Sequence, residues 1–172
     1  MDFARLKYIK NVNDEEGWAY SDNPRWAYFR LNFKRGDKIN VKEHALNLPK
    51  GSLIILSQKP PHRERYLTHV VEVVNERSED EPQQEEGMWG IFRWVKIHWI
   101  ADFGHPSKNP LDDDVMKGKI PLDKEEMRVD WGWENTLAKS LEGEKLMSKW
   151  KTIENLRTHL EEVFMKKYLS HG

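Results

Sequence analysis

Histidines and aspartates are the side chains of this sequence best suited to act as acids, bases or metal ligands. The seven histidines are scattered, and none stands in the HExxH arrangement or in another spacing that brings two imidazoles to one zinc ion. His69 and His98 fall inside predicted strands, where a histidine is more often a hydrogen-bonded structural residue than a catalytic acid or base. We therefore predict neither a metal site nor a catalytic histidine.

An acidic run, Asp112 to Asp114, is the other candidate for chemistry, because hard cations such as Mg²⁺ prefer carboxylate oxygens. A nuclease acting through Asp102 or this run stays open as a hypothesis, although no predicted strand supplies the usual Glu-x-Lys partner. A solvated turn is the simpler interpretation. The motifs GxSxG, GxxxxGK[ST] and GxGxxG do not occur, so serine hydrolases, P-loop enzymes and dinucleotide-binding enzymes lack their signatures.

Tryptophans in loops are the most distinctive feature. Trp18 and Trp26 precede the predicted sheet, and Trp131 and Trp133 follow it. Flat, rigid rings on loops could stack a flipped base, cage a methylated group or hold a planar ligand. Burial in an aromatic core is the competing interpretation. The basic loop segments near these rings, NFKRGDK and HRER, could contact a nucleic-acid backbone through Lys34, Arg35, Lys38, Arg63 and Arg65.

Composition indicates one domain, residues 1–172, in a reducing compartment. The chain is long enough for a continuous core. It contains no cysteine, which excludes disulfides and thiolate zinc sites and favours the cytoplasm. Its N-terminus has no apolar run of signal-peptide length, so we expect no membrane association. A formal net charge of -1 means that any contact with nucleic acid must be a local patch.

The elements that would position these residues are short helices and strands within 1–135. FARLKYI (3–9) alternates as a strand, and NVKEHALNL (40–48) has the capping pattern of a helix. LIIL (53–56) and YLTHVVEVVNE (66–76) have the apolar content of central strands. A long strand beginning near Trp89 should pair antiparallel to the second of these, with Arg93 and Trp99 on one face.

A helical segment is predicted over 136–170, where apolar residues recur at intervals of three and four. This amphipathic helix should close over the sheet or bind a partner. Its apolar stripe consists of Leu146, Trp150, Ile153, Leu156, Leu160, Val163 and Phe164.

The order of these elements over about residues 1 to 130 resembles the PUA-like superfamily and, within it, the EVE domain. The counterparts are FARLKYI, NVKEHALNL, PKGSLIILSQ, YLTHVVEVVNE and WGIFRWVKIHWIADF. The resemblance implies an α+β fold: a small mixed or mostly antiparallel β-barrel with flanking helices. It also implies a pocket that receives a modified base, with Ser57 as a polar contact and Trp18, Trp26, Trp131 and Trp133 as candidate walls.

Three functions follow as hypotheses. We expect a nucleic-acid reader, of DNA or RNA, that accepts a modified base in an aromatic pocket and needs no cofactor. A protein-interaction or homodimerisation module using the C-terminal helix is the alternative. A metal-dependent nuclease is the third. Binding is thus expected in preference to catalysis.

Overall fold

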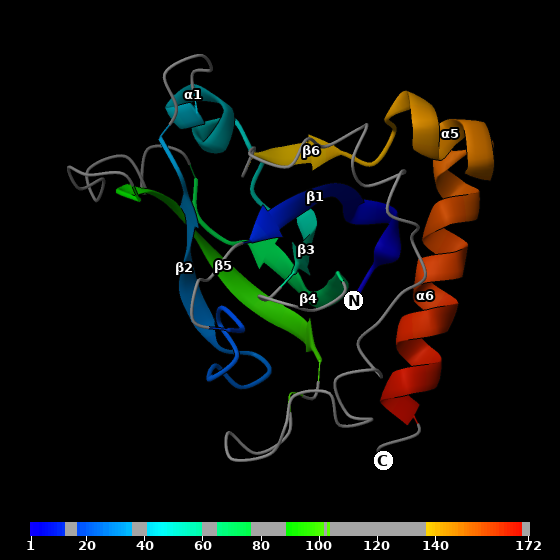
Figure 1. The fold of residues 1–172 in the computed structure, drawn as a ribbon, viewed down its shortest axis with the longest axis horizontal. Helices are drawn as coiled ribbons and strands as arrows, with labels where there is room; N and C mark the ends of the chain where they lie inside the picture. The colour runs from blue at the N-terminus through cyan, green and yellow to red at the C-terminus, as the bar shows by residue number, and fades with distance from the viewer. Residues whose placement is uncertain are drawn as a thin grey trace.

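A computed structural model describes residues 1–12, 17–35, 41–59, 65–76, 89–101, 103 and 137–169. The fold is α+β: one six-stranded mixed sheet curls into a half-barrel, and helices cover parts of it (Figure 1). The strands are β1 (Leu6–Val12), β2 (Tyr28–Phe33), β3 (Leu53–Gln58), β4 (Tyr66–Val73), β5 (Ile91–Ile100) and β6 (Ala138–Ser140). The helices are the 3-10 turn η1 (Phe3–Arg5), α1 (Val41–Leu46), α5 (Glu144–Trp150) and α6 (Ile153–Leu169).

The strand order is β2-β5-β4-β3-β1-β6. Strands β1 and β3 run parallel, and the other neighbouring pairs are antiparallel. Parallel neighbours need a long connection, which here includes β2 and α1. Their carboxyl ends therefore lie together at one end of the sheet, beside the amino end of β4.

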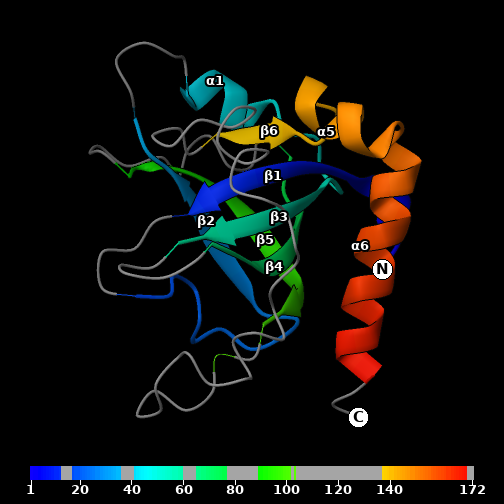
Figure 2. The same ribbon diagram turned by 45° about the vertical axis from the view of Figure 1, so that its right-hand side comes forward.

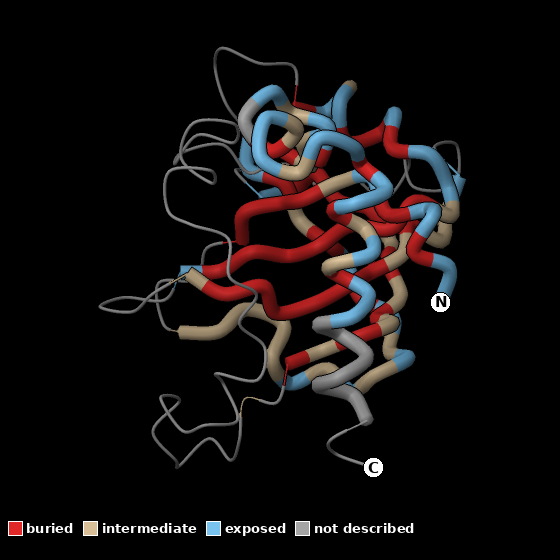
Figure 3. The backbone as a smooth tube through the Cα atoms, turned by 90° about the vertical axis from the view of Figure 1, so that its right-hand side faces the viewer, coloured by how far each residue is buried: buried red, intermediate tan, exposed pale blue. Residues whose placement is uncertain are grey.

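Two apolar cores lie on opposite faces of the sheet. The α6-side core joins β1, β3 and β4 to α5 and α6. The α1-side core joins β2, β5 and the opposite faces of β3 and β4 to α1. Central strands contribute to both, which explains why every residue of β3 is buried. Figure 3 shows buried backbone positions concentrated in the strands behind α6, whose outward positions are exposed. Burying each large apolar side chain stabilises the fold by about 1.5–3 kcal/mol.

Arg93 fixes α1 against the sheet. Its guanidinium is fully buried and donates to the carbonyl oxygens of Ala45, Leu46 and Leu48 at 2.9, 3.4 and 2.7 Å. It also donates to the carbonyl oxygen of Asn75 at 2.6 Å. The last carbonyls of a helix have no partner within the helix and carry partial negative charge, so a cation there is stabilising. One side chain of β5 therefore terminates α1 and holds the turn after β4.

A β-bulge in β5 redirects its outer residues. Val71 pairs with Ile97 and Val70 pairs with Trp99, so His98 is an extra residue between these pairs. Ile97 lies in the α1-side core, but Trp99 lies in the α6-side core. The expectation that Arg93 and Trp99 share one face is therefore wrong, because the bulge switches the face after Ile97.

The structure differs from the sequence expectations at both ends of the chain. Phe3 to Arg5 form a 3-10 turn in place of the start of a strand, and Ala4 is exposed. Over 136–170 the expected single helix is instead the strand β6 followed by two helices. Lys151, with φ of 69°, breaks the helical path between α5 and α6. In addition, β2 was not predicted, and its last two residues, Asn32 and Phe33, belong to the segment NFKRGDK that was expected to be loop.

Within the described ranges, no helix has the length and apolar content needed to cross a membrane.

Candidate functional site

A group of polar and aromatic side chains lies where β1 and β3 end and β4 begins. We call Asn11, Trp18, Ser57, Arg65 and Tyr66 the strand-end cluster. The parallel pairing of β1 with β3 sets Asn11 opposite Ser57, and the antiparallel pairing of β3 with β4 sets the next residue of β3 opposite Tyr66. Three strands thus bring polar residues to the same end of the sheet.

Arg65 joins the polar members of the strand-end cluster. Its Nη1 donates to Asn11 Oδ1 at 3.1 Å and to Ser57 Oγ at 3.2 Å. Ser57 is fully buried and Asn11 nearly so. Burial lowers the pKa of Arg65 from its usual value, although the group remains a cation at neutral pH. The arrangement is a partly buried cation whose orientation is fixed by two neutral acceptors.

Trp18 forms the aromatic part of the strand-end cluster with Tyr66. Its ring centroid lies 5.6 Å from that of Tyr66, with the rings at 71°, and 5.3 Å from that of Phe103, with the rings at 42°. The indole Nε1 of Trp18 is buried and has no hydrogen-bond acceptor in the described part of the chain. A buried N–H without a partner is unfavourable by about 1–3 kcal/mol, so it needs an explanation.

Gln58 holds the segment that carries Trp18 onto the sheet. Its side-chain oxygen accepts from the Ala19 N–H at 2.8 Å, and its Nε2 donates to the Ala19 carbonyl oxygen at 3.1 Å. Nε2 also lies 2.7 Å from the Thr68 hydroxyl. The amide thereby imitates a backbone pairing and sets the position of Trp18, the residue before Ala19.

A buried histidine extends this support. His69 lies 2.8 Å from the Thr68 hydroxyl through Nδ1 and 3.3 Å from the Tyr20 carbonyl oxygen through Nε2. Burial lowers the pKa of His69 to about 4, and the hydrogen bond to Tyr20 only partly opposes this shift. The imidazole is neutral at pH 7, so its contribution here is structural support.

Trp26 lies outside the strand-end cluster. Its ring meets the edge of His98 at 5.4 Å between centroids, and Arg25 and Lys96 lie over its face. Its φ of 71° is a left-handed conformation that is unfavourable by roughly 1–2 kcal/mol for a residue other than glycine. The Trp26 N–H donates to the Ile97 carbonyl oxygen at 2.9 Å, which helps to hold that conformation.

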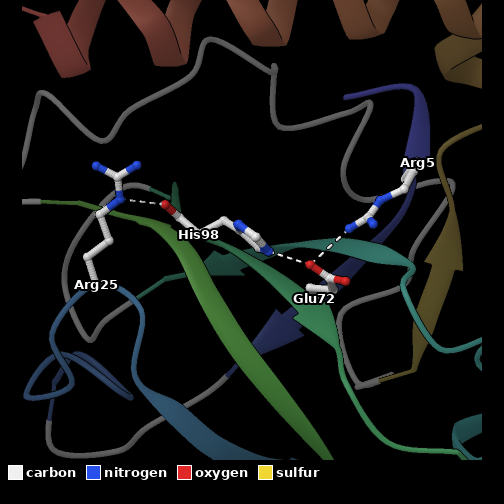
Figure 4. A network of polar contacts seen from close by, with 4 residues as sticks. All are labelled: Arg5, Arg25, Glu72 and His98. Atoms are coloured by element: carbon white, nitrogen blue, oxygen red, sulfur yellow. Dashed lines mark hydrogen bonds and ion pairs between the residues drawn. The ribbon is translucent and has the colours of Figure 1, made fainter. Parts of the chain in front are cut away.

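A polar network lies next to Trp26 (Figure 4). Glu72 accepts from Arg5 at 2.9 Å and from His98 at 2.5 Å, and the His98 carbonyl oxygen accepts from Arg25 Nε at 3.0 Å. Burial opposes ionisation of Glu72, but its bonds to His98 and Arg5 lower its pKa overall. Burial lowers the pKa of His98 and outweighs the effect of Glu72. The carboxylate of Glu72 is therefore already engaged within the chain.

The remaining predicted site residues are distributed as follows. Lys34 and Arg35 are exposed after the end of β2. Arg65 was predicted to contact a nucleic-acid backbone, and the structure shows it bonded to Asn11 and Ser57 in the strand-end cluster. The predicted Trp131, Trp133, Lys38 and Arg63 lie outside the described residues, as do Asp102 and Asp112 to Asp114. No group of three potential metal ligands occurs among the residues that the structure describes.

The described part of the C-terminal stripe packs inside the chain. Ile153, Leu156 and Leu160 are buried in the α6-side core, and Trp150 packs against it. These are side chains that the interaction hypothesis would offer to a partner. Their burial indicates that the apolar side of α6 packs against the sheet of its own chain.

Sequence inspection did not identify Asn11, Gln58 or Tyr66 as site residues. Asn11 and Gln58 are polar residues at the ends of otherwise apolar strands, and this position was the available indication. No protein-family model, curated protein or solved structure matches the chain. Function is therefore inferred from the geometry of the described residues alone.

Proposed function

We propose that this chain is a nucleic-acid-binding reader domain that accepts a single, preferably modified, base at the strand-end cluster. The curled mixed sheet and its flanking helices are compatible with the PUA-like, EVE-type barrel that the order of elements suggested. Aromatic stacking and a few fixed polar groups are how proteins bind an extruded base.

The observation that carries this proposal is the buried indole N–H of Trp18, which has no acceptor among the described residues. The Trp18 ring contacts the rings of Tyr66 and Phe103. Tyr66 follows Arg65 directly in the chain. Base edges present carbonyl oxygens and ring nitrogens, which are the acceptors that such a donor requires. A base at this position would satisfy a donor for which the described residues supply no acceptor.

The polar members of the strand-end cluster would add selectivity. Ser57 and Asn11 orient the guanidinium of Arg65 through their oxygens. A guanidinium held in one plane can stack on a base or donate to its edge. A ligand that offers no acceptor to the buried Trp18 N–H leaves that donor unpaired, which penalises the wrong base.

Trp18→Phe tests the proposal, because it keeps an aromatic ring and removes only the N–H. Binding should be measured by fluorescence anisotropy with short DNA and RNA oligonucleotides, each with and without base modifications. Loss of one neutral hydrogen bond, worth about 1 kcal/mol, should weaken binding of the preferred oligonucleotide about fivefold. Unfolding stability should not fall, because an unsatisfied donor has been removed.

Trp150→Phe is the matched control. The Trp150 indole N–H is also buried without an acceptor in the described part of the chain, but it belongs to α5 and lies outside the strand-end cluster. This variant should bind every oligonucleotide as the parent does. The proposal is refuted if Trp18→Phe, while folded, retains the full preference among the oligonucleotides.

A further inference from the structure

One surface of the sheet carries exposed aromatic rings and cations together. Alternate residues of β2 and β5 enter the α1-side core, so Tyr28, Arg30, Trp94 and Lys96 lie on the opposite face. The strand register sets Tyr28 opposite Lys96 and Arg30 opposite Trp94. We call these four residues, with Arg25 and Trp26, the aromatic-basic face. Figures 1 and 2 both show β2 on the opposite side of the molecule from α6, which leaves this edge of the sheet uncovered by that helix.

Two rings of the aromatic-basic face, those of Trp26 and Tyr28, are open to solvent. Trp26 is 48% exposed and Tyr28 is 58% exposed, whereas most large apolar side chains of the described ranges are buried. Trp89, at the start of β5, is also exposed and has Lys34 Nζ 6.0 Å from its ring centroid. Exposed aromatic residues gathered on one face of a sheet usually indicate a binding surface.

Cations lie over these rings. Lys96 Nζ is 5.0 Å from the centroid of Trp26 and 5.6 Å from that of Tyr28, and Arg25 Cζ is 4.5 Å from Trp26. Arg30 Cζ lies 5.0 Å from the ring of Phe92, the next outward residue of β5. Rings that accept stacked bases, flanked by cations that reach phosphates, are the features of surfaces that bind single strands without sequence preference.

The neighbouring carboxylate does not cancel this charge. Glu72 stands opposite Lys96 in the register, but Arg5 and His98 already bind it. The whole chain has a net charge of only -1, so positive potential is confined to local groups such as this one. The backbone of Trp26 is also strained into the left-handed region, and strained residues concentrate where a side chain must be held in a particular direction.

We infer that the aromatic-basic face binds single-stranded nucleic acid, with bases stacked on Trp26 and Tyr28 and phosphates at Arg25, Arg30 and Lys96. The inference rests on the proposed function in taking nucleic acid as the ligand, but it concerns a different surface. The segment 17–27 carries Trp18 at one end and Trp26 near the other. A strand bound across the face could therefore present one of its bases to the strand-end cluster.

Labelled oligothymidylate and oligouridylate of 12 nucleotides, and a 12-base-pair duplex, test this inference by fluorescence anisotropy. The wild-type chain should bind the single strands more tightly than the duplex. Trp26→Ala and Tyr28→Ala should each weaken binding of the single strands about tenfold, because a stacking contact is lost. Trp26→Phe should restore part of the affinity. Thermal unfolding of each variant confirms that the exposed substitutions leave the fold intact.

The charge contribution is tested by salt dependence. Lys96→Gln should reduce the slope of log affinity against log salt concentration by about 0.7, the value for one phosphate contact on a single strand. Lys42→Gln, on the exposed side of α1, is the matched control and should leave the slope unchanged.

The outcomes separate the two surfaces. Equal loss of affinity for modified and unmodified strands in the Trp26 and Tyr28 variants supports the inference, whether or not the strand-end cluster selects a base. Loss of selectivity alone, in Trp18→Phe, concerns only the proposed function. The inference is overturned if the folded variants of Trp26, Tyr28 and Lys96 bind single strands with the wild-type affinity and salt slope. Absence of any single-strand binding by the wild-type chain also overturns it.

Discussion

Lys10 is a buried lysine with no countercharge among the described residues, and it should make stability depend strongly on pH. Only 1% of the residue is exposed. Its Nζ donates to the Asn11 carbonyl oxygen at 3.2 Å and lies 4.8 Å from the centroid of the Phe33 ring. No carboxylate partner occurs among the residues that the structure describes. Burial lowers the pKa of Lys10 from 10.5 to about 7.

The size of the effect follows from the difference between the pKa of Lys10 in the unfolded chain and its pKa in the native chain. In the unfolded chain Lys10 stays protonated up to about pH 10.5, whereas in the native chain it loses its proton near pH 7. Each pKa unit corresponds to about 1.4 kcal/mol, so the buried amine destabilises the native state by about 4 kcal/mol at neutral pH. Between pH 7 and 10.5 the unfolded chain binds more protons, so stability rises with pH. Below pH 7 the penalty is constant.

Lys10→Met removes the amine and nearly preserves its volume. Urea unfolding, followed by tryptophan fluorescence, should show a variant more stable than the wild type by about 4 kcal/mol at pH 7. The difference should shrink as the pH approaches 10. Lys7→Met, at an exposed position of the same strand, is the control and should not be stabilised by a comparable amount. A Lys10→Met variant that is less stable at pH 7, or whose difference from the wild type is constant with pH, would refute this reasoning.

Two further predictions concern buried groups. Because burial lowers the pKa of His69 to about 4, stability should fall by about 3 kcal/mol as the pH decreases from 6.5 to 4, and His69→Gln should flatten that part of the acid-unfolding curve. Arg93→Met should reduce the free energy of unfolding by about 3–5 kcal/mol in urea, because four carbonyl oxygens lose their buried donor. A loss below about 1 kcal/mol would mean that water replaces the guanidinium.

The central strands and α1 were predictable because their local patterns are strong. The run Leu53 to Leu56 is apolar throughout, as a strand buried on both faces requires, and β3 includes it. The Asn40 capping pattern placed a helix where α1 lies, with Val41 and Ala45 buried. The pairing of β4 with β5 was also confirmed. In each case the side chains that enter a core recur at the period of the element.

Other elements had little local pattern. β6 is only three residues long, Ala138 to Ser140, and none of them is buried, so its pairing with β1 alone makes it a strand. β2 alternates buried Phe29, Leu31 and Phe33 with polar residues, but turn-forming residues before it and cations after it concealed this alternation.

The candidate site was predictable only in part. Trp18 was named from its residue type and Ser57 from the family resemblance, and both are members of the strand-end cluster. Asn11 and Arg65 join them because β1 pairs with β3 in parallel across more than 40 residues of sequence, which no local pattern indicates. Trp26 was expected beside Trp18, but Trp26 lies with His98 on the face of β5.

The return of the C-terminal segment to β1 has a consequence for the order of folding during synthesis. β6 pairs with β1, and Arg157 Nε donates to the Leu6 carbonyl oxygen at 2.8 Å, a contact between residues 151 positions apart. Until β6 has been made, β1 is an edge strand, and until α6 has been made, the α6-side core lacks its helical cover. Unpaired edges and exposed apolar faces are the features that chaperones recognise and that promote aggregation. The first strand is therefore open to wrong pairing until β6 and α6 are made.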